Sequence, residues 1–299
     1  MIRLNEVLLE IFLLFQHQSK IMEEYSKKWL EGATEDLDAA NLLFQNKKYR
    51  QAILYLQQTC EKTAKGLLMK IGFLPDYEEN EEQKAAREVV GIKSAKPIDY
   101  GHTWHKKFLD VLDETVGSTS PIVKLMIKFP NKELSSNIKN FWNDSEFRNR
   151  IEKARRVNIN PVPSLKETED VITACNSILD LSIETNKKVI ENAKKTKLPD
   201  KKSIIKFIEK QLNYKVNGKS MEMIDKIYNK NPEEFLIKRV TFSFTLTVLA
   251  ILNIYLLPHE KMARYPDSNI SVEYNENLSI IQKFNEISAL LKRCLDSVV

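Results

Sequence analysis

The stretch YLQQTCEKTAKGLLMKIGF, residues 55–73, pairs an apolar stripe with a polar face that could bind a ligand. Its apolar residues recur at steps of three and four, the period of an amphipathic helix: Leu56, Cys60, Ala64, Leu67 and Ile71. The other side carries amides and charges: Gln57, Gln58, Glu61, Lys62 and Lys65. Such amides can both donate to and accept from a base edge. The polar face is therefore either a solvated surface or one wall of a binding groove.

A second candidate site is ARYPD, residues 263–267. Arg264 offers bidentate donors to a phosphate or a carboxylate, and Tyr265 can stack on a base. The alternative is structural: Arg264 pairs with a carboxylate such as Glu61 or Asp267 and locks a corner between two helices. Both interpretations stay open at the level of sequence.

Histidines and glycines limit the chemistry that can be expected. His102 and His105 are spaced to share a metal ion on one helix, but further ligands would have to come from distant segments. We therefore predict no metal site. The seven glycines form no phosphate-binding loop and no nucleophile elbow, so no cofactor is expected.

The charge balance permits an anionic partner without requiring one. The chain has 46 basic and 41 acidic side chains, a net charge of +5. Basic residues cluster in RNRIEKARR, residues 148–156, and again between residues 187 and 202. Such runs are usually solvated helix faces, and the alternative is a surface that follows phosphates.

The remaining pattern predicts an all-α protein. Helices are expected over residues 4–25, 29–46, 49–72, 100–114 and 164–193, followed by a final helix through Leu278 to Leu291. Ser164 and Glu167 form a capping-box pattern. The three cysteines lie in apolar helical patterns, which predicts buried thiols in a reducing cytoplasm.

One uncharged stretch raises the question of a membrane. VTFSFTLTVLAILNIYLLP, residues 240–258, approaches the length of a membrane span. Polar residues dilute it, and a fully buried bundle helix has the same composition. We expect a buried core helix that ends at Pro258 rather than a membrane span.

Three pieces, in chain order, resemble the HEPN family (higher eukaryotes and prokaryotes nucleotide-binding). They are WLEGATEDLDAANLLFQNKKYRQAILYLQQTCEKTAKGLLMKIG, then YGHTWHKKFLDVL, and finally ARYPD. The resemblance implies an up-and-down helical bundle, often dimeric. It divides the chain into an N-terminal helix (1–25), HEPN-like helices (26–117), an inserted helical subdomain (118–235) and closing HEPN-like helices (236–299).

The resemblance also implies a function. It predicts a cytoplasmic protein that binds RNA or a nucleotide in a prokaryotic toxin–antitoxin or defence module, with a nucleotidyltransferase-type partner and as a homodimer. The residues that match the family's motifs are the expected ligand-binding residues: Gln57, Glu61, Lys62, Lys65, Arg264 and Tyr265.

Two alternatives remain. One branch of the family consists of ribonucleases with an Arg-x4-6-His motif, in which His can act as acid or base. No histidine here follows an arginine at that spacing, although His259 and Arg264 occur in the reverse order. The catalytic candidates of this alternative are His259, His102 and Arg264. The other alternative is a non-enzymatic helical module that binds proteins.

Overall fold

A computed structural model describes residues 20–70, 132–144, 149, 162–195, 232–264 and 272–298. Every regular element in these ranges is a helix, which confirms the all-α prediction. The elements are α2 (Lys20–Gln45), α3 (Tyr49–Lys70), α7 (Lys132–Asn143), α9 (Leu165–Lys195), α12 (Pro232–Arg264), α13 (Ser279–Gln282) and α14 (Phe284–Val298).

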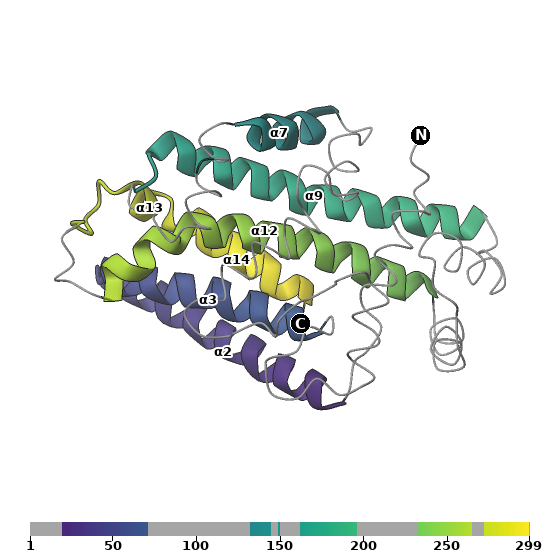
Figure 1. The fold of residues 1–299 in the computed structure, drawn as a ribbon, viewed down its shortest axis with the longest axis horizontal. Coiled ribbons are helices and arrows are strands. Elements are labelled where there is room, and N and C mark those ends of the chain that lie inside the picture. Colours follow the sequence, from purple (N-terminus) through teal and green to yellow (C-terminus); the bar gives the residue numbers. More distant parts are fainter. Residues whose placement is uncertain are drawn as a thin grey trace.

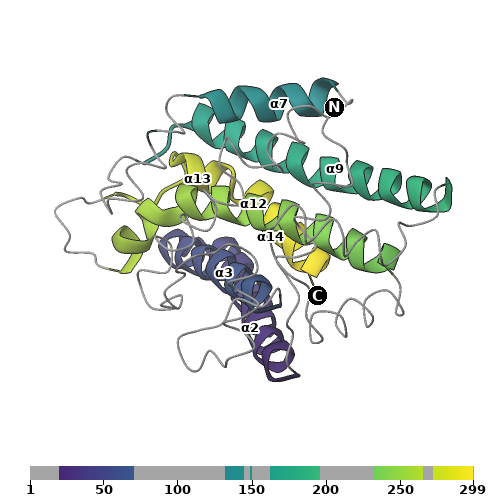
Figure 2. The same cartoon turned by 45° about the vertical axis from the view of Figure 1, so that its right-hand side comes forward.

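The helices form a layered bundle around α12 (Figure 1). The α2–α3 hairpin lies on one side of α12 and α9 on the other, with α7 on the outer face of α9. Figure 2 shows α14 beside α12, where its apolar face closes the core. The arrangement fits the up-and-down bundle that the resemblance implies.

The hairpin between α2 and α3 is tightly packed. The hydroxyl of Ser26 donates to the Gly66 carbonyl at 2.8 Å, so the two backbones approach closely near Gly66. A Cβ atom at Gly66 would lie 2.8 Å from Leu30 side-chain atoms. The predicted break between residues 46 and 49 is confirmed. By contrast, α2 runs unbroken from Lys20, because residues 25–29 contain neither Gly nor Pro.

α9 begins with the predicted capping box. The Ser164 amide donates to a Glu167 carboxylate oxygen at 2.6 Å, and the Glu167 amide donates to the Ser164 hydroxyl at 3.2 Å. α9 packs on α12, and the two share one hydrophobic core with α3 and α14. The described part of the predicted 118–235 insert therefore contributes to the main core. The predicted segment boundaries stay predictions.

α12 is the central core helix. Among the described residues, Val240–His259 is long and apolar enough to cross a membrane, and 89% of it is buried inside the protein. The prediction that Pro258 ends this helix is wrong, because α12 continues to Arg264. Proline removes one helical hydrogen bond, and α12 bends in its C-terminal part (Figure 1). Arg50 of α3 donates to the carbonyls of Met262 and Ala263, both at 3.0 Å, and so holds the extended end.

The expected final helix is divided in two. α13 ends at Gln282, and α14 begins at Phe284 after a turn at Lys283. The ammonium of Lys283 lies 3.1 Å from carboxylates of both Glu169 and Glu286, which ties this turn to α9. The predicted inward residues Ile281 and Phe284 are buried.

The three cysteines are free, buried thiols, as predicted. They come from three different helices, α3, α9 and α14, and the Cys60 thiol donates to the Leu249 carbonyl at 3.3 Å. Burial raises the pKa of Cys60 and Cys175 well above the usual value and that of Cys294 to about 12. None of the three carries thiolate character at neutral pH.

A pair of glycine substitutions tests the hairpin packing. Gly66→Ala should lower the free energy of unfolding by about 1–2 kcal/mol, because the new methyl group overpacks the contact with Leu30. Gly32→Ala should raise the free energy of unfolding by up to about 1 kcal/mol, because alanine favours the helix. The new methyl group would lie 3.5 Å from the nearest atom of the Lys62 side chain, which is an ordinary contact. Urea denaturation measures both variants. Equal stabilities for the two would contradict this close approach.

Thiol labelling tests the buried core. The native protein at pH 8 should react with Ellman's reagent in none of its cysteines on a time scale of minutes, because each thiol is inaccessible and its pKa is raised. In concentrated urea all three thiols should react. Rapid labelling of any thiol in the folded protein would show that the core is open.

Candidate functional site

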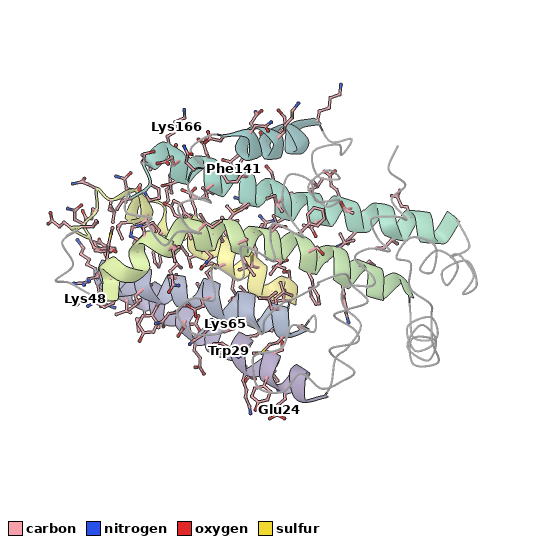
Figure 3. The ribbon with its side chains drawn as sticks, viewed as in Figure 1. Glu24, Trp29, Lys48, Lys65, Phe141 and Lys166 are labelled. Carbon is pink, nitrogen blue, oxygen red and sulfur yellow. The ribbon has the colours of Figure 1, made fainter. Side chains whose placement is uncertain are left out.

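The polar face of α3 forms a chain of contacts one helical turn apart. The Gln57 amide donates to one Glu61 carboxylate oxygen at 3.3 Å, and the Lys65 ammonium lies 2.6 Å from the other. That ammonium also lies 4.9 Å from the centre of the Trp29 ring of α2, a cation–π contact. Figure 3 shows Lys65 and Trp29 where α3 meets α2. The contacts join three of the predicted ligand-binding residues.

Lys62 makes a parallel connection to α2. Its ammonium lies 2.7 Å from a carboxylate oxygen of Asp36 and 3.4 Å from the Gly32 carbonyl. Burial raises the pKa of Asp36, and the Lys62 ammonium limits the rise. We call this set the α2–α3 charge network, and it consists of Trp29, Asp36, Gln57, Glu61, Lys62 and Lys65.

Burial decides which network members can meet a ligand. Gln57 is 0% exposed and Lys65 2%, although a solvated face was one of the two interpretations of the sequence. The Lys62 side chain is 30% exposed, the largest value among the four predicted residues of α3 whose burial is described. Two carboxylates balance the two lysines, so the network has no excess positive charge. Its first effect is to hold α2 against α3, and only Lys62 can turn its ammonium to solvent.

The structure places Arg264 far from this network. Arg50, the second residue of α3, contacts Ala263, so the last residue of α12 lies beside the start of α3. Glu61 is eleven residues further along α3, or about 16 Å. The backbone of Arg264 therefore lies away from Glu61, one of the two carboxylates proposed as its partner. Tyr265 and Asp267 lie outside the described residues.

His259 lies inside the protein. Its side chain is 0% exposed, and its Nδ1 atom is 3.1 Å from the Tyr274 hydroxyl. Burial raises the pKa of Tyr274 to about 12, against an opposing effect of Arg50. A general acid or base must reach its substrate, so the burial of His259 argues for a structural role. The other candidate, His102, lies outside the described residues.

Sequence reasoning missed several residues of this region. Asp36 and Trp29 were within the matched motif, but only the contact between helices shows that they pair with lysines of α3. Arg50 was missed because an arginine at a helix start shows no partner in the sequence. In the described ranges, no group of three or more His, Cys, Asp or Glu side chains is arranged to hold a metal ion.

Fold and site together define an all-α bundle whose first hairpin is joined by the Asp36–Lys62 ion pair and by the contact of Lys65 with Trp29. A family model, the HEPN domain, matches residues 26–83 and thus covers most of α2 and all of α3. This match supports the HEPN resemblance over residues 26–83, and with it a nucleotide- or RNA-related function in general. No curated protein and no solved structure matches the chain.

The raised pKa of Asp36 predicts a pH dependence. The native state keeps this proton to higher pH than the unfolded chain, so Asp36 makes the free energy of unfolding fall as pH rises above about 4. Asp36→Asn should remove this contribution. The free energy of unfolding of the variant, relative to that of the wild type, should therefore increase from pH 4 to pH 7. Urea denaturation at several pH values measures it.

Asp38→Asn is the matched control, because Asp38 is an exposed carboxylate on the same helix. A difference between Asp36→Asn and wild type that stays constant with pH would rule out a raised pKa for Asp36.

Proposed function

We propose that this protein binds RNA through its HEPN-like helices, as a cytoplasmic component of a prokaryotic toxin–antitoxin or defence module. The observation that carries the proposal is the HEPN match over α2 and α3, which contain the charge network. The burial of His259 argues against cleavage that uses this histidine.

The ligand contacts divide between two places. Lys62 is the partly exposed cation of the network, and Arg264 stands at the end of α12. In this proposal both contact phosphates, Tyr265 stacks on a base, and the buried Gln57 and Lys65 hold the hairpin in place with Glu61. Lys62 is twelve residues, or about 18 Å, along α3 from Arg50, beside which α12 ends, and this separation favours an RNA strand over a single nucleotide.

The same proposal includes partners. A nucleotidyltransferase-type protein and a second copy of this chain are the expected ones, on the grounds of the family resemblance. The described helices are balanced in charge, which is compatible with a contact to either of these proteins.

RNA binding by purified protein tests the function. A labelled single-stranded RNA of mixed sequence should bind at 0.1 M salt, and its affinity should fall as salt rises. The double variant Lys62→Gln/Arg264→Gln should bind roughly ten-fold more weakly, because two phosphate contacts are lost. Fluorescence anisotropy measures the affinity, and circular dichroism shows whether the variant is folded.

Lys27→Gln/Lys28→Gln is the matched control, because both lysines are exposed, paired with glutamates and distant from Arg264. It removes the same charge and should bind like the wild type. Failure of the wild-type protein to bind the RNA at low salt would overturn the proposed function.

A further inference from the structure

The turn between α2 and α3 is a second basic surface, and none of its residues is among the predicted ligand-binding residues. It has the sequence NKKYR, residues 46–50, and the Arg50 contact brings the end of α12 beside it. We call this surface the basic corner and define it by Lys47, Lys48 and Arg50. The structure thus places the predicted ligand residue Arg264 with these three residues and away from Lys65.

Lys47 has an unusual backbone conformation. Its φ angle is 56°, in the left-handed region that glycine or asparagine normally occupies after a helix. The turn hydrogen bonds around it are regular, with the Lys47 amide on the Phe44 carbonyl at 3.0 Å and the Lys48 amide on the Leu43 carbonyl at 2.9 Å. Backbone geometry would favour glycine at this position, so it does not explain the lysine.

The side chains of the corner keep most of their positive charge available. The Lys47 ammonium and the Tyr49 hydroxyl share one partner, Glu276, at 3.2 and 3.1 Å. The Lys47 and Glu276 side chains are 75% and 69% exposed, and such an exposed pair is weak. Lys48 is exposed, and it stands at the end of the molecule in Figure 3.

Arg50 differs from the two lysines. Its described hydrogen bonds go to main-chain carbonyls of α12, so no carboxylate takes part in them and the guanidinium charge is not neutralised there. It also holds the end of α12 in place, and with it the backbone of Arg264. Arg50 is therefore a positioning residue for the corner, and the exposed lysines are its contact groups.

We propose that the basic corner binds phosphate groups of an RNA strand, with Lys47 and Lys48 as direct contacts and Glu276 as the carboxylate that a phosphate replaces. The proposal rests on the proposed RNA-binding function and adds a surface to it. Lys47 and Lys48 sit at the turn between two rigid helices, where their exposed ammonium groups can follow neighbouring phosphates.

The test uses a variant that the turn should tolerate. Lys47→Gly suits the left-handed backbone, and Lys48→Gln removes the second charge without shortening the side chain much. Lys47→Gly/Lys48→Gln should weaken binding of labelled single-stranded RNA roughly ten-fold at 0.1 M salt and reduce the salt dependence by about one phosphate contact or more. Lys27→Gln/Lys28→Gln, at the other end of α2 beside Glu24 (Figure 3), should change neither.

Different failures have different meanings. If wild-type protein binds RNA and Lys47→Gly/Lys48→Gln binds it equally well, the corner is not a contact surface, while the proposed function stands. Equal weakening by both double variants also overturns the inference, because net charge alone would then explain it. If the wild-type protein binds no RNA, both proposals fail. Binding of ATP that depends on Lys47 and Lys48, with unchanged RNA affinity, would assign the corner to a free nucleotide and contradict the proposal.

Discussion

The close approach of α2 to α3 is the constraint on which the rest of the structure depends. Gly66 has no side chain, so Leu30 and the Ser26 hydroxyl can lie directly on the α3 backbone. At this separation, Asp36 of one helix reaches Lys62 of the other. A wider hairpin would separate this carboxylate from its ammonium, and a partly buried charge without its partner is far more costly than a buried pair.

α12 depends on this hairpin in turn. Its uncharged segment needs apolar neighbours on all sides, and α3, α9 and α14 supply them. Its last turns extend past Pro258, where the helix has lost one hydrogen bond. Arg50 binds the exposed carbonyls at that end, so a residue of the hairpin fixes where Arg264 stands.

The approach of α2 to α3 and the contact of Arg50 with α12 separate two roles, helix packing and ligand binding. The HEPN-like motif suggested that the same residues have both roles. Buried members of the α3 polar face, such as Lys65, serve the packing of the hairpin. Among the cations of residues 29–70, Lys62 is partly exposed, and Lys47 and Lys48 at the α2–α3 turn are exposed. An RNA-binding surface at that turn is consistent with a family association with nucleotides, and it leaves the buried His259 as part of the core.

The sequence by itself determined the helical class, the α2–α3 break, the capping box at Ser164 and the inward face of α3, because each depends on local periodicity or on side chains within one turn. It also determined the HEPN resemblance, through residues 29–72. The sequence could not predict where α12 ends or that much of the polar face of α3 is buried. Both depend on partners far away in the chain, Arg50 for α12 and Asp36 for Lys62, and only the tertiary structure brings such residues together.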